Sequence, residues 1–296
     1  IIDRQHTNAM NTDGFREYIF HADKNMIFPY KDEEFIRMWV ADMEFATPDV
    51  VIEGMRKRLD KRIFGYTRVF ESSYYDAFAA WCKRRYDWTF EKNELVMSNG
   101  IIPALYETVE YICKPDEKVL FLTPSYAYFK YAAEFNKREY VCSNLRYENE
   151  RYVIDFDDFA LKASDKKTTL FIFCNPHNPL GHVWTHEELE AIGNLCIKYK
   201  VPVISDEIHA DLTLWDNKHI PMASVSEEIR QNTITCTSTG KAFNLAGLQS
   251  ATIVFNNLEM KAKFDKFWKN LEVHRNNPFN LVATIAAYSD GGEEYL

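Results

Sequence analysis

The chain has 296 residues, of which 46% are hydrophobic and 27% are charged, and its formal net charge at pH 7 is −9. This balance is typical of a folded globular protein and excludes a disordered or fibrous chain. The acidic surface argues against binding to nucleic acid or to anionic membranes, because both need clustered positive charge, so we expect a protein that acts on a small molecule.

The cysteines and the chain ends give further expectations. Six cysteines are scattered without a C-x-x-C pair, so we expect reduced thiols in a cytoplasmic protein and no structural metal. No apolar run approaches the length of a membrane helix, and no signal peptide opens the chain. Residues 293–296 resemble the first turn of a helix after a Ser-Asp-Gly-Gly stop, which indicates a fragment cut near its C-terminus.

Short apolar runs alternate with amphipathic stretches along the chain, which is the pattern of an α/β fold. Helices are expected at 48–59 after a cap at Thr47, at 71–86, at 186–199 after a capping box at Thr185, and at 281–288. Strands are expected at 95–98, 118–122, 139–142, 169–174, 201–205, 233–237 and 251–255. Crossover helices between strands predict a three-layer α/β/α domain around a mostly parallel seven-stranded sheet.

Ligands of such a sheet bind outside the carboxyl ends of its strands, so the residues there are the candidates for function. After the first strand, a turn at Gly100 leads into a helix at Ile101, whose free N–H groups could hold a phosphate. After the second strand, Tyr126 could stack on a flat ring, although simple packing is the commoner use of a tyrosine. After the fourth strand, two Asn-Pro dipeptides form a rigid loop that aims the amides of Asn175 and Asn178.

Two more strand ends carry ionisable side chains. Asp206 ends an apolar strand, where a carboxylate is costly unless it faces a cation, so it either caps a helix or pairs with a protonated nitrogen. Lys241 lies in the loop Thr237–Asn244 among small polar residues, and this loop is not a P-loop because residue 235 is Thr. Such a lysine can form a Schiff base, although most lysines are simply solvated.

A phosphate cradle, a stacking aromatic, an amide, an acid and a Schiff-base lysine are together what pyridoxal 5'-phosphate requires. The whole chain resembles the fold-type I pyridoxal-phosphate enzymes of the aminotransferase class I/II superfamily, and within it the MalY/PatB-type cystathionine β-lyase branch. The motifs that carry the resemblance are Met38–Met43, Gly65–Thr67, Ser98–Gly100, Thr123–Tyr126, Asn175–Pro179, Ser205–His209 and Ser238–Asn244.

The resemblance implies a role for each matched residue. Lys241 would carry the cofactor and act as the base at the substrate Cα, and Asp206 would pair with the pyridine nitrogen. Tyr126 would stack on the ring, and Asn178 would hydrogen-bond to its phenolate oxygen. The phosphate would be held by Gly100, Ile101 and Ser238, with Tyr66 reaching across from a second subunit as a third catalytic residue beside Lys241 and Asp206.

The resemblance also implies a homodimer with shared active sites and a division into domains. An N-terminal arm with part of the small domain would cover residues 1–35, and the large cofactor-binding domain would cover 36–286. Residues 287–296 would begin a small α+β domain that is largely missing. The arginine that binds the substrate carboxylate in this family would lie in that missing part.

Two positions depart from the common aminotransferase pattern and look like the lyase branch. His209 stands where many aminotransferases carry a phenolate-binding Tyr, and Gln249 stands where they carry a phosphate-binding Arg. We therefore expect a carbon–sulfur β-lyase that releases a thiol, pyruvate and ammonia from L-cystathionine or related cysteine S-conjugates. An aminotransferase of the same fold and a regulatory protein that retains the fold are the alternatives. A Rossmann dehydrogenase is excluded because no G-x-G-x-x-G follows a strand.

Overall fold

The computed structural model describes residues 2–23, 25–270 and 276–296, and the chain divides into two compact units, Ile1–Thr47 and Pro48–Leu296. The domain limits expected from the sequence stay predictions. The first unit holds helix α1 (Phe15–Phe20) and the short 3₁₀ helix η1 (Asp32–Glu34). Its small core is aromatic: the buried Phe15 ring lies 5.4 Å from the ring of Trp39 and 5.4 Å from that of Phe35.

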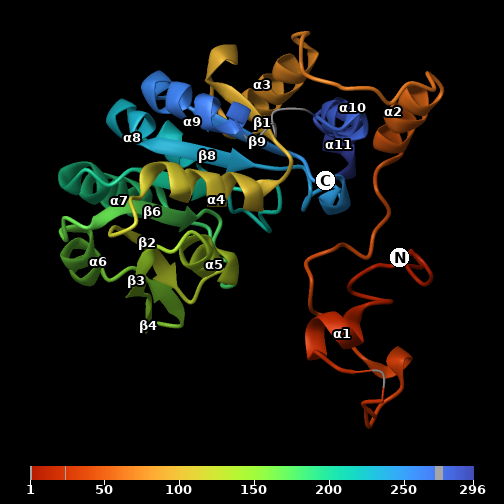
Figure 1. Cartoon of the computed structure of the whole chain (residues 1–296), viewed down its shortest axis with the longest axis horizontal. Helices are drawn as coiled ribbons and strands as arrows, with labels where there is room; N and C mark the ends of the chain where they lie inside the picture. Colours follow the sequence, from red (N-terminus) through yellow and green to blue (C-terminus); the bar gives the residue numbers. More distant parts are fainter. Residues whose placement is uncertain (1, 24, 271–275) are drawn as a thin grey trace. The chain divides into compact units, whose positions relative to one another are not determined.

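The second unit is built on a seven-stranded sheet (Figure 1). Its strands are β1 (Leu95–Ser98), β2 (Lys118–Thr123), β3 (Glu139–Asn144), β6 (Thr168–Cys174), β7 (Val203–Asp206), β8 (Thr233–Thr237) and β9 (Ala251–Phe255). They lie in the order β1-β9-β8-β7-β6-β2-β3. All pairs are parallel except the two that β9 makes, with β1 and with β8. The seven strands and the mostly parallel sheet expected from the sequence are confirmed.

Helices cover both faces of this sheet and complete the three layers. They are α2 (Asp49–Leu59), α3 (Ser73–Tyr86), α4 (Ile101–Ile112), α5 (Ala127–Phe135), α6 (Phe156–Ala163), α7 (His186–Tyr199), α8 (Glu227–Gln231), α9 (Leu258–Asn270), α10 (Pro278–Ala287) and α11 (Asp290–Tyr295). The remaining 3₁₀ turns are η2 (Lys92–Glu94), η3 (Met222–Ser224) and η4 (Ala246–Leu248).

Successive side chains of β6 alternate between two hydrophobic clusters, one on each face of the sheet. Leu170 and Ile172 point into the cluster under α4, α5 and α9, whereas Phe171 and Phe173 point into the cluster under α6, α7 and α8. A strand that is buried on both faces reads as a continuous apolar run, because successive side chains alternate between the faces. A third cluster packs α2, α3 and α10 together.

One hairpin was not predicted from the sequence, and two predicted helix ends were wrong. Strands β4 (Arg146–Glu148) and β5 (Arg151–Val153) form a separate two-stranded sheet. Helix α2 begins at Asp49, after Pro48, and no side-chain hydrogen bond caps it. The Gly-Gly pair lies inside α11. A Cβ on Gly292 would lie 1.8 Å from the Ala287 carbonyl oxygen. Close packing against α10 therefore requires glycine there, and the pair is no helix stop.

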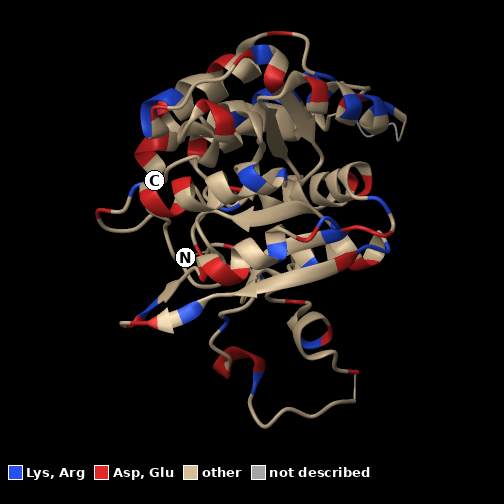
Figure 2. Ribbon diagram, turned by 90° about the vertical axis from the view of Figure 1, so that its left-hand side faces the viewer, with Lys and Arg blue, Asp and Glu red and all other residues tan. Residues whose placement is uncertain are grey.

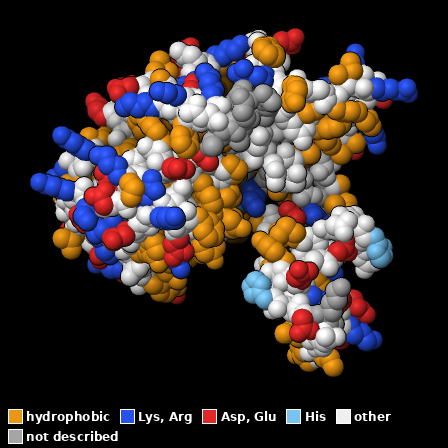
Figure 3. Space-filling model, viewed as in Figure 1, with side chains coloured by type: hydrophobic (Ala, Val, Ile, Leu, Met, Phe, Trp, Pro, Cys, Tyr) orange, Lys and Arg blue, Asp and Glu red, His pale blue; other side chains and the backbone are white. Residues whose placement is uncertain are grey.

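Basic and acidic residues are interspersed along the helices of the second unit (Figure 2). Hydrophobic side chains gather over α5 (Figure 3), where Phe135 is 69% exposed and Tyr131 is 37% exposed. Within the described ranges, no helix is long and apolar enough to cross a membrane.

Candidate active site at the carboxyl ends of the strands

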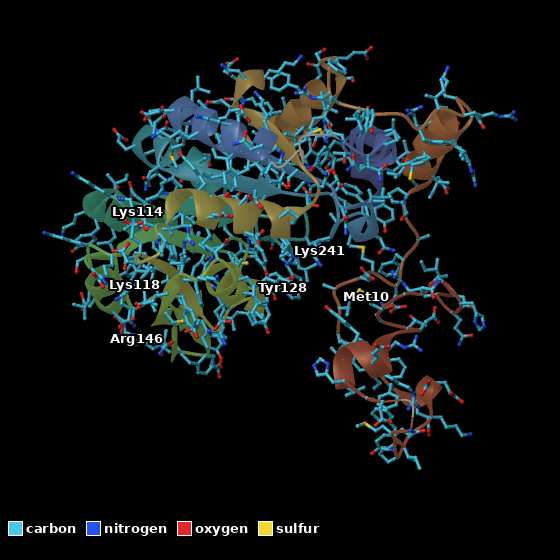
Figure 4. The ribbon with its side chains drawn as sticks, in the orientation of Figure 1. Met10, Lys114, Lys118, Tyr128, Arg146 and Lys241 are labelled. Carbon is cyan, nitrogen blue, oxygen red and sulfur yellow. The ribbon has the colours of Figure 1, made fainter. Side chains whose placement is uncertain are left out.

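Strands β1, β2, β6, β7 and β8 run in the same direction, so the loops that follow them meet at one edge of the sheet. Lys241 lies at that edge, whereas Lys118, at the start of β2, lies at the opposite end (Figure 4). The five loops singled out in the sequence are these five. Their side chains are therefore brought toward a common region, as the topology of a parallel sheet requires.

Asp206 is the last residue of β7 and is 2% exposed. Burial raises the pKa of its carboxyl from 3.8 to about 7, and the nearby Glu207 charge acts in the same direction. In the described part of the chain, its carboxylate accepts one long hydrogen bond, from the Ile208 amide at 3.4 Å. A buried acid with so little hydrogen bonding is suited to a cationic partner such as a protonated ring nitrogen.

Lys241 lies within electrostatic range of two ionisable side chains, those of Asp206 and His209. Its charge opposes the rise in the pKa of Asp206. Burial lowers the pKa of His209 to about 4, and the Lys241 charge lowers it further in the same direction. The structure thus brings Lys241, Asp206 and His209 together from two loops, and His209 is a neutral imidazole at pH 7.

Asn178 is held by the thiol that ends β6. The backbone N–H of Asn178 donates to Cys174 Sγ at 3.2 Å, and that thiol donates to the Pro176 carbonyl at 3.2 Å. Cys174 is opposite Asp206 in the register of β6 and β7. Asn178 and His209 also line one cavity of about 260 Å³. The Asn-Pro loop therefore lies next to the loop that carries the acid.

A phosphate-sized anion finds donors at the start of α4. Gly100 precedes the helix with φ 113° and ψ 164°, a conformation open almost only to glycine, and Ile101 is the first helical residue. The Ser98 hydroxyl donates to the Gly100 carbonyl at 2.7 Å and holds the turn in place. The first amides of a 12-residue helix have no partner within the helix, and the helix dipole favours a negative charge there.

Ser238 directly follows β8 and Gln249 directly follows η4, and they differ in the bonds that they make. The Ser238 hydroxyl already donates to the Ser250 carbonyl at 2.6 Å and accepts from the Gly240 amide at 2.9 Å. Its proton is thus engaged within the protein. Gln249 ends η4 with φ 51°, and its carbonyl accepts from Asn280 at 3.4 Å.

The two tyrosines expected at the cofactor differ in burial. Tyr126 directly precedes α5, packs partly against the core, and stacks on the Tyr128 ring at 5.1 Å between centroids. Tyr66 is 91% exposed and lies in an extended stretch. The next residue, Thr67, forms an isolated antiparallel β-bridge with Asn276. The structure does not bring Tyr66 into the buried part of its own chain's site.

Sequence reasoning missed the buried polar network behind Asp206. Glu207 and Asp211 flank His209 and bond to residues far along the chain, among them Tyr86 and His219. The only sequence feature that could have indicated this network was the Asp-Glu pair, Asp206–Glu207, at the end of a buried strand. The bonds from Glu207 to His219 and from Asp211 to Trp81 span 12 and 130 residues, so no local pattern identifies these partners.

These residues fit pyridoxal 5'-phosphate in kind. A buried acid with a raised pKa suits the pyridine nitrogen, an amine lies near it, and a glycine turn before a helix suits the phosphate. Asn178 and the partly buried Tyr126 supply an amide and an aromatic face.

Comparison with known proteins agrees with this geometry. The family model for aminotransferase class I and II matches residues 33–285. Cystathionine beta-lyase PatB of Bacillus subtilis is 39% identical over 86% of this chain and 66% of its own length. The chain thus spans slightly less than two thirds of the length of that curated relative.

Solved structures show the same likeness. The PLP-bound C-S lyase of Staphylococcus hominis matches with a TM-score of 0.89 and 44% identity, over 100% of this chain and 71% of that one. Cystalysin of Treponema denticola, which contains pyridoxal 5'-phosphate, matches with a TM-score of 0.90 and 28% identity, over 99% and 72%. Homologous structures therefore bind this cofactor.

Proposed function

The chain belongs to the aminotransferase class I and II family, and from that premise we propose that it is a pyridoxal-phosphate-dependent carbon–sulfur β-lyase. The substrate would be L-cystathionine or a related S-conjugate of cysteine, and the products a thiol, pyruvate and ammonia. The observation that carries the cofactor assignment is the buried Asp206 within range of Lys241. The names of PatB and of the Staphylococcus hominis C-S lyase favour lyase chemistry over transamination.

Bound pyridoxal phosphate supplies an electron sink for the electron pair left at the substrate Cα. Lys241 is proposed to hold the cofactor and to remove the Cα proton. The Cβ–S bond then breaks, and the sulfur leaves with the bonding pair and takes up a proton as a thiol. The remaining enamine reacts with one water to give pyruvate and ammonia, so the overall reaction consumes one water and no oxidant.

The surrounding residues orient these events. Asp206 is proposed to keep the ring nitrogen protonated, and its low exposure strengthens that charge pairing. Asn178 and the neutral His209 are proposed to lie beside the phenolate oxygen of the cofactor ring, since both line the same cavity. Gly100 and Ile101 are proposed to bind the phosphate through backbone amides, with Ser238 contributing after its hydroxyl turns from the Ser250 carbonyl.

We also propose that two copies of the chain share their active sites through Tyr66. Large apolar side chains surround Tyr66 along the chain and are mostly exposed: Ile63 is 65% exposed, Phe64 55% and Phe70 82%. Exposed apolar residues clustered in one stretch are typical of a surface that another chain covers. Light scattering should give the mass of a dimer, and Tyr66→Phe should weaken binding of pyridoxal phosphate.

Absorbance of the purified protein with pyridoxal phosphate tests the cofactor assignment. A visible band should form with the wild type and should be absent with Lys241→Ala. Adding L-cystathionine should then release thiol and pyruvate without any 2-oxo acid, whereas an aminotransferase would require one. If a well-folded wild type forms no band, the cofactor assignment is wrong. If the band forms but turnover needs a 2-oxo acid, the lyase assignment is wrong.

A further inference from the structure

The segment after β7 carries an unusual density of buried ionisable side chains. Within six residues it contains Asp206, Glu207, His209 and Asp211. Glu207 is 2% exposed, and the Asp211 side chain is 10% exposed. The proposed function uses Asp206 and His209 but gives no role to the two other carboxyl groups.

The Glu207 carboxylate is fully engaged by Ser205, His219 and Met222. Its carboxylate accepts from the Ser205 hydroxyl at 2.7 Å and from the Met222 amide at 3.0 Å. It also pairs with His219 Nε2 at 2.8 Å. His219 Nδ1 has no partner among the described residues, so the tautomer with its proton on Nε2 leaves no buried donor unsatisfied. Two of these three directional contacts fix Glu207 against residues 219–222, and the third joins it to the end of β7.

Asp211 fastens the other end of the segment to helix α3. Its carboxylate accepts from Trp81 Nε1 at 2.9 Å and from the Tyr86 hydroxyl, and it forms an ion pair with Arg85 at 3.4 Å. Burial raises the pKa of Asp211, and the bonds from Tyr86 and Trp81 act against that rise. The two attachments are linked, since the Tyr86 ring meets the His219 ring edge to face at 5.2 Å.

Buried carboxylates are a poor means of stabilising a fold, because their desolvation offsets much of what their partners contribute. Their advantage is geometric: a fully bonded carboxylate has one orientation, whereas an apolar side chain can shift within its pocket. Glu207 and Asp211 also line, with Ser238, one small cavity of about 10 Å³. The network therefore reaches the loop that carries Lys241.

We propose that Glu207 and Asp211 are positioning residues, which hold the segment 206–211 so that Asp206 and His209 face Lys241. This inference rests on the proposed function, since Asp206 and His209 matter as cofactor-binding residues. The two carboxylates act through the segment and touch neither substrate nor cofactor. Loss of either charge should loosen both ends of the segment without removing a binding group.

The test compares Glu207→Gln and Asp211→Asn with Glu94→Gln. Glu94 is a matched control: it is 6% exposed, pairs with Arg230 at 3.2 Å, and precedes β1 at the other end of the sheet. Tyr86→Phe, which removes one bond to Asp211 and leaves its charge, serves as the milder variant. All four should lose some thermal stability, so stability alone does not decide the matter.

The first readout is the pKa of His209 in the apoprotein, measured by NMR of the imidazole ring. It is lowered to about 4 by burial and by the Lys241 charge. A loosened segment lets water reach the ring, so the pKa should rise in Glu207→Gln, Asp211→Asn and Tyr86→Phe and stay unchanged in Glu94→Gln. Simple removal of a negative charge would lower it instead, so the sign separates the two effects.

The second readout is the affinity for pyridoxal phosphate and the turnover of the loaded protein. We expect binding weaker by about tenfold and kcat lower by about 10-fold to 100-fold, which is the size of effect that misplacement of orienting groups produces. If the variants match Glu94→Gln in both readouts, the positioning role is refuted. If the wild type binds no pyridoxal phosphate, the proposed function fails, while the His209 titration still decides whether the carboxylates hold the segment.

Discussion

Asp206 gives a stability prediction whose sign follows from its surroundings. Burial raises the pKa of its carboxyl from 3.8 to about 7. The folded apoprotein therefore keeps a proton on Asp206 that the unfolded chain releases, so the free energy of unfolding falls as the pH rises through this window. A difference of about 3 pH units corresponds to about 4 kcal/mol at about 1.4 kcal/mol a unit.

Asp206→Asn removes this titration and keeps the shape of the side chain. The variant apoprotein should be more stable than the wild type by about 4 kcal/mol at about pH 8 and by about 1.5 kcal/mol at about pH 5, where the penalty has only begun. Urea unfolding followed by circular dichroism measures both values. Added pyridoxal phosphate should stabilise the wild type more than the variant, because its ring nitrogen would pair with the Asp206 carboxylate.

Glu94→Gln is again the matched control for this experiment, because the Glu94 carboxylate is paired with Arg230. Its loss should destabilise the protein at both pH values, opposite in sign to Asp206→Asn. The reasoning is refuted if Asp206→Asn changes the free energy of unfolding equally at both pH values, or if it destabilises the apoprotein at about pH 8.

Three further predictions concern local structure. Thr185→Ala removes the side chain that caps α7 and should cost about 1 kcal/mol in urea unfolding; a cost equal to that of Thr185→Ser would contradict the capping role. Gly100→Ala should cost about 1 to 3 kcal/mol and weaken cofactor binding, because φ is 113° there, whereas Gly65→Ala, whose added Cβ would meet no atom within 4 Å, should leave the free energy of unfolding unchanged. Phe173→Ala leaves a cavity at a side chain that is 1% exposed and should lower the free energy of unfolding by about 3 to 5 kcal/mol. Phe135→Ala on the surface should lower it by about 0.5 kcal/mol or less. Similar losses for the two variants would be inconsistent with the packing described.

The sequence by itself determined where the strands of the seven-stranded sheet lie and which loops hold the candidate site. The run Leu170–Cys174 is apolar at every position, because β6 is buried on both faces, and such runs are visible without a structure. The capping box at Thr185 is equally local, since its two partners are three residues apart. Because parallel strands end at one edge, the loops carrying Asn178, Asp206 and Lys241 could be assigned to a common region.

Only the tertiary structure decided the pairing of the strands and the network behind the site. The antiparallel pairing of β1 with β9 joins residues more than 150 positions apart, and apolar periodicity carries no information on partners. The bonds from Trp81 and Tyr86 to Asp211 span 130 and 125 residues. The sequence could not reveal them, because a buried carboxylate is recognised by the donors that surround it, and those donors come together only when the chain folds.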